Sequence, residues 1–268
     1  NLAVNVILLW RLSHWRPVRQ YSWISFREQF SFGSKLALSG IIDTVYRNIY
    51  LIVIGKIFKA SELGYYTRAH QFADFPSSNL TGIIHRVTFP VLCTIQDDDE
   101  RLRSVYRRFL RLLAFIIFPL MIGLAAIAHP LIVLLLKGQW SFTALLLQIL
   151  CFAMMWYPIH AINLNLLQVK GRSDLFLRLE IIKKCIGIVV LCVTIPMGLV
   201  AMCFGSVISS IISLVINTRY TGKLINVGFL TQMRDLMPTL FYSFSMGGVV
   251  WLTIHLVDGN WQQLATGI

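Results

Sequence analysis

The sequence predicts an all-α fold, a polytopic bundle of membrane helices. Only 13% of the 268 residues are charged and 56% are hydrophobic, whereas soluble domains carry about 25% charged residues. Apolar runs long enough to cross a bilayer recur along the chain. The formal net charge is +12, but the basic residues are concentrated in the links between the apolar runs. That distribution is typical of membrane topology and argues against a nucleic-acid partner.

The first complete span covers residues 36–58. Residues 1–11 resemble the end of a preceding span, and residues 12–35 are expected to form an amphipathic helix in the cytoplasmic membrane interface. Polar residues lie in the middle of the 36–58 span, where Asp43 and Arg47 are four apart and share a helix face. Two interpretations stay open: a structural ion pair inside a bundle, or a polar pathway for a charged solute.

The other spans follow in order. Residues 62–95 form a semi-polar segment in which Pro76 should kink or start the membrane part. Residues 129–140 are too short to cross and are expected to be re-entrant or interfacial. Gly205, Ser209 and Ser213 recur every four residues, which is typical of a close helix-packing stripe and not of a site. The remaining predicted spans are 109–128, 142–168, 176–195, 199–217 and 236–257, with a tight turn at 196–198.

The distribution of Lys and Arg predicts the orientation. Eighteen of the 24 lie in alternate links, and four lie in the intervening links. The remaining two, Arg47 and Arg86, each fall near the middle of a predicted span. The basic links, which are expected to be cytoplasmic, are 11–35, 96–111, 169–184 and 217–235.

No motif for catalysis, nucleotide binding or metal binding is found, so no enzyme activity, catalytic residue, metal or cofactor is expected. The five cysteines lie in apolar segments without metal spacing. The acidic run at 97–100 has two interpretations, a cation site or a helix-capping loop, and the arginines that follow favour the loop.

Three stretches carry a family resemblance. They are SFGSKLALSGIIDTVYRNIYLIVIGKIFKASELGYYTRAHQFADFPSSNLTGIIHRVTFPVL, FPLMIGLAAIAHPLIVLLLKGQW and WYPIHAINLNLLQVKGRSDLFLRLEIIKK. They resemble bacterial polysaccharide flippases of the multidrug/oligosaccharidyl-lipid/polysaccharide exporter superfamily, of the type that handles O-antigen or colanic-acid-type repeat units. The resemblance implies two six-helix lobes that rock around a central cavity. It assigns 1–11 to the last span of the first lobe, 12–35 to the linker, 36–221 to the six-span C-terminal lobe, and 222–268 to an extra span and truncated tail.

The resemblance also implies a function. Such proteins move undecaprenyl-diphosphate-linked oligosaccharide units across the bacterial inner membrane by alternating access, for lipopolysaccharide, capsule or exopolysaccharide biosynthesis. The expected partners are that lipid-linked oligosaccharide, membrane lipid, the missing N-terminal lobe and other polysaccharide-assembly proteins. Two alternatives remain: a cation-coupled multidrug antiporter of the same superfamily, and a membrane-bound polysaccharide polymerase or acyltransferase.

Position and chemistry select the candidate site residues. A diphosphate needs cationic hydrogen-bond donors, and sugars need amides and phenols along a wet cavity. Asp43 and Asp74 are candidates for ion coupling, although an ion pair with Arg47 favours a structural role for Asp43. The candidate substrate-binding residues are Arg47, Arg68, Arg86, Asn48, Tyr50 and Asn79, of which Arg47 and Arg86 are expected to hold the diphosphate.

Overall fold

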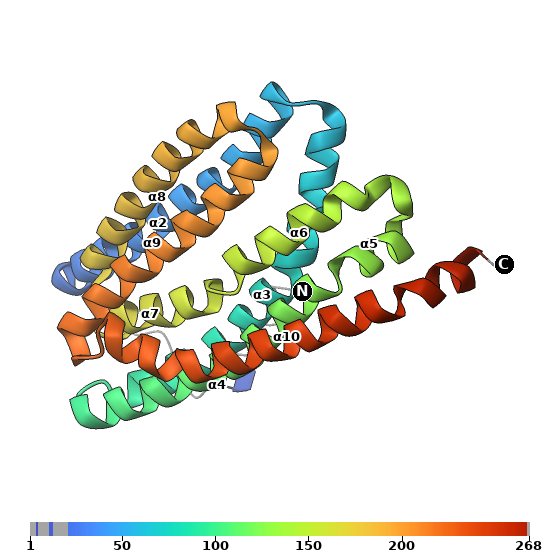
Figure 1. Cartoon of the computed structure of the whole chain (residues 1–268). Helices are drawn as coiled ribbons and strands as arrows, with labels where there is room; N and C mark the ends of the chain where they lie inside the picture. The colour runs from blue at the N-terminus through green and yellow to red at the C-terminus, as the bar shows by residue number, and fades with distance from the viewer. Residues whose placement is uncertain (1–3, 5–10, 13–20, 267–268) are drawn as a thin grey trace.

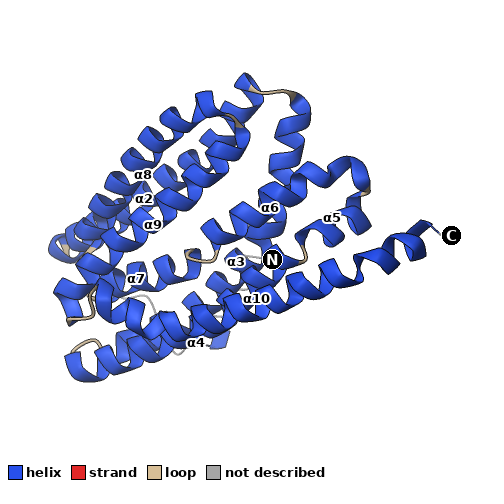
Figure 2. Ribbon diagram, viewed as in Figure 1, coloured by secondary structure: helices blue, strands red, loops and turns tan. Residues whose placement is uncertain are grey.

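The structure, a computed structural model, describes residues 4, 11–12 and 21–266, without the side chains of Arg47, His255 and 257–266. Most of the span end predicted at 1–11 therefore lies outside the described residues. Every element from residue 21 to residue 266 is helical (Figure 2). In chain order they are α2 (Trp23–Ile57), α3 (Ala60–Thr94), α4 (Asp99–Ala126), α5 (Ala128–Leu136), η1 (Gly138–Trp140), α6 (Ser141–Met154), α7 (Tyr157–Val169), α8 (Ser173–Thr194), η2 (Ile195–Met197), α9 (Leu199–Ile225) and α10 (Phe229–Thr266).

The helices form two groups (Figure 1). In one group α8 packs against both α2 and α9, and in the other α3 packs against α6 and α7 while α10 runs along α4. Contacts of α9 with α6 and α7 join the two groups. The hydrophobic core is centred on α4, α6 and α7, where Tyr106, Phe118 and Leu146 are fully buried. An all-α bundle is thus confirmed.

Five segments are long and apolar enough to cross a membrane, so the chain is a multi-pass membrane protein. They are Trp23–Ile57, Asp99–Ala126, Gly138–Val169, Leu199–Ile225 and Phe229–Ile254. The predicted spans at 62–95 and 176–195 correspond to α3 and α8, which have 35 and 22 residues. Both are long enough to cross, since about 20 residues suffice, but neither is among the segments that are also apolar enough. Their place in the bundle depends on packing against neighbouring helices.

The N-terminal linker and the first span form one continuous helix. The Ser22 hydroxyl accepts from the Ser25 amide and caps α2, which then runs to Ile57 without a break at residue 35. In its first two turns Trp23 stacks on Phe26, and Phe26 on Phe30, with ring centroids 5.5 and 5.7 Å apart. These exposed aromatic rings agree with an interfacial start. Similarly, α3 begins 16 residues before Pro76 and continues through it, so Pro76 does not start that helix.

The span predicted over 142–168 lies within the segment Gly138–Val169, but its helix is broken between α6 and α7. Pro158 lies in the first turn of α7 and has no N–H for the carbonyl of Met154. The Ser77 hydroxyl of α3 donates to that carbonyl instead, at 2.8 Å. The Ser210 hydroxyl of α9 donates to the neighbouring Ala153 carbonyl at 2.9 Å. Side chains from two other helices therefore satisfy the backbone at the break.

Two short links behave as predicted. Helix α5 has nine residues, which span only about 14 Å, so the segment after Ile127 does not cross. The turn between α8 and α9 ends at Gly198, whose φ of 98° lies in the left-handed region that glycine adopts without strain. The polypeptide reverses direction there in a few residues.

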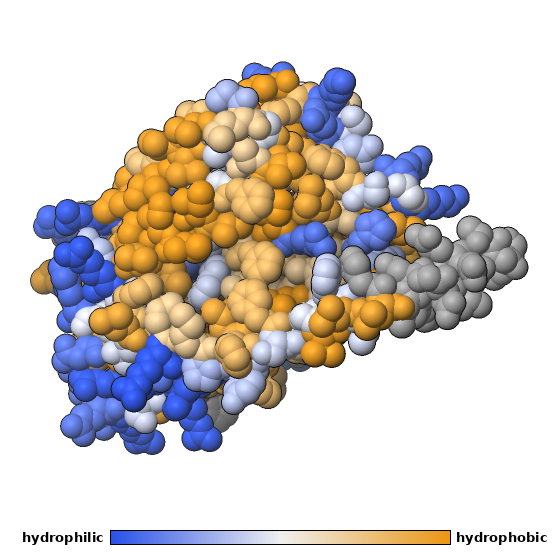
Figure 3. Space-filling view, viewed as in Figure 1, coloured by the Kyte–Doolittle hydropathy of each residue, from blue (hydrophilic) through white to orange (hydrophobic). Residues whose placement is uncertain are grey.

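The links predicted to be cytoplasmic gather at one end of the bundle. The beginnings of α2, α4, α8 and α10 all lie at the left of Figure 1, and the opposite links lie at the top and the right. Figure 3 shows hydrophilic side chains over the end where α4 and α10 begin, followed by a broad hydrophobic band. This arrangement agrees with alternating spans.

Hydrogen bonds fix the start of α10 to the rest of the bundle. The Arg107 guanidinium of α4 donates to both carboxylate oxygens of Asp235, at 2.6 and 2.7 Å. Deeper in, Asn163 of α7 accepts from Thr221 of α9 at 2.6 Å and from Gln232 of α10 at 3.0 Å, and all three side chains are buried. Because a buried amide is costly to leave unpaired, this network specifies where α10 docks.

Candidate functional site

A cavity of about 430 Å³ lies between the two groups of helices. Its walls come from α2, α3, α7, α8 and α9, with the end of α6. Three carboxylates and two ammonium groups line it together with phenols, hydroxyls and two histidines. The charged lining residues are Asp43, Asp74, Glu180, Lys183 and Lys184.

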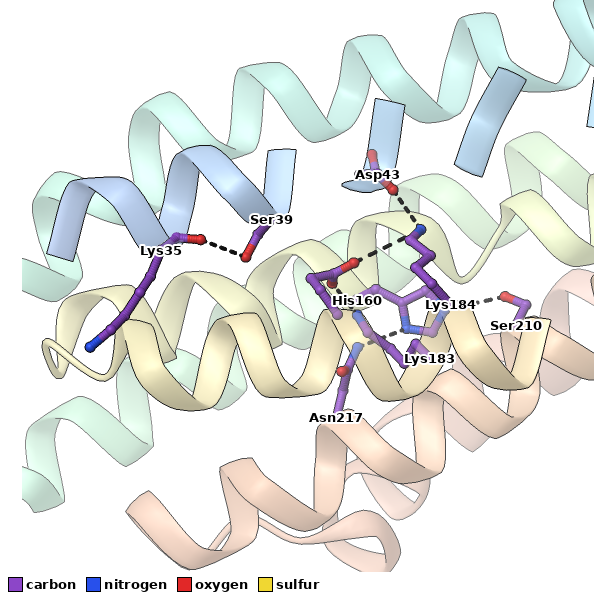
Figure 4. Close-up of polar contacts among 9 residues, drawn as sticks. Lys35, Ser39, Asp43, His160, Lys183, Lys184, Ser210 and Asn217 are labelled. Carbon is purple, nitrogen blue, oxygen red and sulfur yellow. Dashed lines mark hydrogen bonds and ion pairs between the residues drawn. The ribbon is translucent and has the colours of Figure 1, made fainter. Parts of the chain in front are cut away.

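The ion cluster joins α2 to α8. The Lys184 ammonium lies 2.6 Å from the Asp43 carboxylate of α2 and 3.8 Å from Glu180, one turn earlier on α8 (Figure 4). Lys183 makes a separate ion pair with Glu180. A charge inside a membrane bundle is stabilised when it is paired, so the cluster offsets the cost of placing four charged groups there. Asp74 is the fifth charged group, and none of the described residues makes a hydrogen bond or ion pair with its carboxylate.

Tyr46 determines how closely α2 and α8 approach. The Lys184 ammonium lies 4.4 Å from the centre of the Tyr46 ring, which also packs edge-on against Tyr50. On α8 the ring meets Gly187, where a Cβ would lie 2.0 Å from the Tyr46 hydroxyl oxygen. Only a residue without a side chain fits at this contact.

A hydrogen-bonded histidine forms the far wall of the cavity. His160 Nε2 lies 3.2 Å from Ser210 Oγ, and the Asn217 amide nitrogen lies 3.5 Å from His160 Nδ1 (Figure 4). Since the Ser210 hydroxyl donates to the Ala153 carbonyl, Ser210 Oγ accepts from Nε2–H and Nδ1 accepts from Asn217. This pattern assigns a neutral imidazole. Ser209 and Ser213, predicted to belong to a helix-packing stripe, also line the cavity, whereas Gly205 packs closely on Thr194.

The structure separates the predicted site residues into two sets. Asp43, Tyr50 and Asp74 line the cavity. Asn48, Arg68, Asn79 and Arg86 do not line it and are exposed on α2 and α3. The side chain of Arg47 lies outside the described residues, so the predicted Asp43–Arg47 pair stays a prediction.

The exposed set on α3 forms a stripe. Arg68, Asn79 and Arg86 are 11 and 7 residues apart, close to three and two whole turns, so they share one helix face. Arg68 donates to Gln71 at 3.1 Å, and the Asn79 amide donates to the Phe75 carbonyl of its own helix at 2.7 Å. Among the described residues, none makes an ion pair with Arg86. We refer to Arg68, Asn79 and Arg86 as the α3 stripe.

Sequence reasoning missed the lysines of the cavity. Lys183 and Lys184 were counted with the basic cytoplasmic link 169–184, but they lie ten and eleven residues into α8 and face the cavity. The run Glu180-Ile-Ile-Lys183-Lys184 contained a usable signal, because both lysines are within one turn of an acid. The partner of Asp43 on another helix left no trace in local spacing.

The fold and its charged cavity define a multi-pass α-helical membrane protein with a polar interior. The family model described as "Polysaccharide biosynthesis protein" matches residues 1–145, so the chain belongs to that family.

Named relatives point the same way. The chain is 33% identical over 192 residues to the "Uncharacterized membrane protein in cps region" of Klebsiella pneumoniae, covering 70% of this chain and 39% of the relative. It is 29% identical over 185 residues to the "Lipopolysaccharide biosynthesis protein WzxC" of Escherichia coli K12, covering 68% and 38%. It is 28% identical over 171 residues to the "Teichuronic acid biosynthesis protein TuaB" of Bacillus subtilis, covering 63% and 35%. The matched part spans less than two fifths of each relative's length. No solved structure matches the chain.

Proposed function

We propose that this chain is the C-terminal lobe of a carrier that moves polyprenyl-diphosphate-linked oligosaccharides across the bacterial inner membrane. Relatives named for lipopolysaccharide biosynthesis, teichuronic acid biosynthesis and succinoglycan biosynthesis transport support a polysaccharide precursor as the cargo. The boundaries 12–35, 36–221 and 222–268 belong to this proposal, as does a first lobe that completes the central cavity. The carrier has no catalytic step.

The α3 stripe is the observation that carries the proposal. Its two arginines are 18 residues apart, which corresponds to about 27 Å along the helix axis. The hydrocarbon core is about 30 Å thick. With α3 centred in the membrane, Arg86 therefore lies near the cytoplasmic boundary and Arg68 near the outer boundary, with Asn79 between them. This differs from the expectation that Arg86 lies near mid-span.

The spacing of Arg68 and Arg86 suits a lipid head group that moves from one membrane interface to the other. A diphosphate enters at the cytoplasmic boundary, where the Arg86 guanidinium offers a fork of charged donors. Arg68 offers the same chemistry at the opposite boundary, and the Asn79 amide lies on the path between them. The polyprenyl tail stays in lipid throughout. Arg47, Asn48 and Tyr50 remain proposed contacts on α2.

Charge substitutions on the stripe test this function in the complete polypeptide. Arg86→Gln and Arg68→Gln are each expected to lower polysaccharide export about tenfold or more, because a hydrogen bond to a charged group is lost. Arg86→Lys keeps a point charge and should retain part of the export. Arg219→Gln, an exposed charge at the end of α9, is the matched control. Surface polysaccharide and accumulated lipid-linked precursor are measured at equal membrane abundance.

One result would overturn the assignment. Normal export by a stably expressed Arg47→Gln, Arg86→Gln double variant would show that these arginines do not hold the diphosphate. An equal loss in Arg219→Gln would show a general charge effect and would remove the support from the stripe.

We also propose Asp74, and not Asp43, as the group that couples an ion to transport. Asp43 is held by Lys184 at 2.6 Å, whereas the Asp74 carboxylate lines the same cavity without a partner among the described residues. A carboxylate that lacks a fixed counter-charge is able to take up a proton or a cation. Asp74→Asn should abolish the dependence of transport on an imposed ion gradient, and an unchanged dependence in this variant would exclude the role.

A further inference from the structure

The seam between α4 and α10 carries an unusual density of arginine where both helices begin. Two of the α4 arginines are committed to protein partners. Arg103 donates to the Ile225 carbonyl at 2.8 Å, and Arg107 makes its bidentate contact with Asp235. The Arg107 contact joins α4 to α10, whereas the Arg103 bond joins α4 to the end of α9.

The other arginines of this seam face outward. Arg101, Arg108 and Arg111 on α4 and Arg234 on α10 are exposed, and among the described residues none makes a hydrogen bond or ion pair with their side chains. Arg108 directly follows Arg107, and Arg234 directly precedes Asp235. Because Arg107 and Asp235 form an ion pair, Arg108 and Arg234 lie at the same level on adjacent helices.

The positions on α4 fall on one face. With 3.6 residues per turn, Arg101, Arg108 and Arg111 lie within an arc of about 80°. Glu100 is an acid of the same turn whose charge opposes this group, and Asp235 is already paired. The balance over the exposed seam therefore stays positive.

Apolar side chains continue the same surface toward the membrane interior. Phe115 on α4 is 71% exposed and Leu112 is 54% exposed. On α10, Met237 and Phe241 are 54% and 71% exposed. A cationic band followed by exposed aromatic and aliphatic groups matches the order of an anionic phospholipid, in which the phosphate lies at the interface and the acyl chains lie below it.

We propose that the α4–α10 seam binds the head group of an anionic phospholipid in the cytoplasmic leaflet. The phosphate is held between the guanidinium groups of Arg108 and Arg234, with Arg101 and Arg111 at its edge, and the acyl chains lie on Phe115 and Phe241. Basic recesses between transmembrane helices on the cytoplasmic side are a recognised way to bind such lipids. This site is separate from the α3 stripe and does not depend on the proposed cargo.

The experiment compares two charge-matched double variants of the complete polypeptide. Arg108→Gln, Arg234→Gln alters the seam. Arg178→Gln, Arg219→Gln removes two charges that are also exposed, one on α8 and one on α9, and leaves the seam intact. Native mass spectrometry of the purified protein counts bound phosphatidylglycerol over a concentration series, with phosphatidylethanolamine and inorganic phosphate as competitors.

The seam variant should bind phosphatidylglycerol about tenfold or more weakly, and the control should bind like the unaltered protein. Phosphatidylethanolamine and inorganic phosphate should both compete poorly. An equal loss in both variants, no loss in the seam variant, or full displacement by inorganic phosphate would each overturn the proposal. Circular dichroism of both variants confirms that the helices are retained.

Discussion

Gly187→Ala should weaken the bundle by a mechanism that can be isolated. The new Cβ would lie 2.0 Å from the Tyr46 hydroxyl oxygen and 2.7 Å from its Cζ. An ordinary contact needs about 3.5 Å, so the ring must move by roughly 1.5 Å. That movement disturbs the Lys184 ammonium above the ring and the Asp43 pair beside it. Overpacking of this kind costs about 1–3 kcal/mol in the free energy of unfolding.

A matched glycine removes the effect of helix propensity. Replacing a helical glycine by alanine favours the helix by about 1 kcal/mol, which partly hides the overpacking. A Cβ at Gly248 in α10 would meet nothing within 4 Å, so Gly248→Ala reports propensity alone. The difference between the two variants, measured by titration with sodium dodecyl sulfate in mixed micelles, should be about 1–3 kcal/mol.

Tyr46→Phe supplies the decisive comparison. Removing the hydroxyl relieves the closest contact, so Gly187→Ala should be less damaging in the Tyr46→Phe background. If Gly187→Ala behaves like Gly248→Ala, or if Tyr46→Phe gives no relief, the close approach of α2 and α8 at this point is refuted.

Three further outcomes follow from the packing. Asp43→Asn should lower the free energy of unfolding by about 1–3 kcal/mol, because the Lys184 ammonium loses its nearest partner. Adding Lys184→Met should restore most of this loss. If it restores nothing, Asp43 and Lys184 do not form a direct pair. Gln232→Leu should cost a similar amount because the Asn163 network loses two hydrogen bonds, and an unchanged value would contradict the buried network. A single cysteine at Ser104 should be shielded from an impermeant thiol reagent added to intact cells, whereas one at Gly198 should react, and labelling at Ser104 would reverse the orientation.

The sequence predicted what depends on local chemistry. Runs of apolar residues predict the spans. The residues Pro196-Met197-Gly198 predict the tight turn, and in the structure Gly198 has the positive φ that such a turn needs. The nine residues of α5 were too few to cross on length alone. Each of these features is decided within a few neighbouring residues.

What the sequence did not reveal depends on contacts between distant helices. Spacing within one helix suggested Arg47 as the partner of Asp43, but it carries no information about Lys184, which is 141 residues away. The break before Pro158 was hidden by an apolar pattern that continues across it. Some candidate site residues line the cavity and others do not. Helical periodicity shows which residues share a face, as in the α3 stripe, but it does not show whether that face meets the cavity.

The broken helix has a mechanical consequence. An intact helix resists bending because each carbonyl is tied to an amide four residues later in the same rod. At the break between α6 and α7, two carbonyls instead accept hydrogen bonds from the hydroxyls of Ser77 on α3 and Ser210 on α9. The angle between α6 and α7 therefore depends on the positions of α3 and α9. A displacement of α3 relative to α9 changes the angle between α6 and α7, and it does so without breaking backbone hydrogen bonds within either helix.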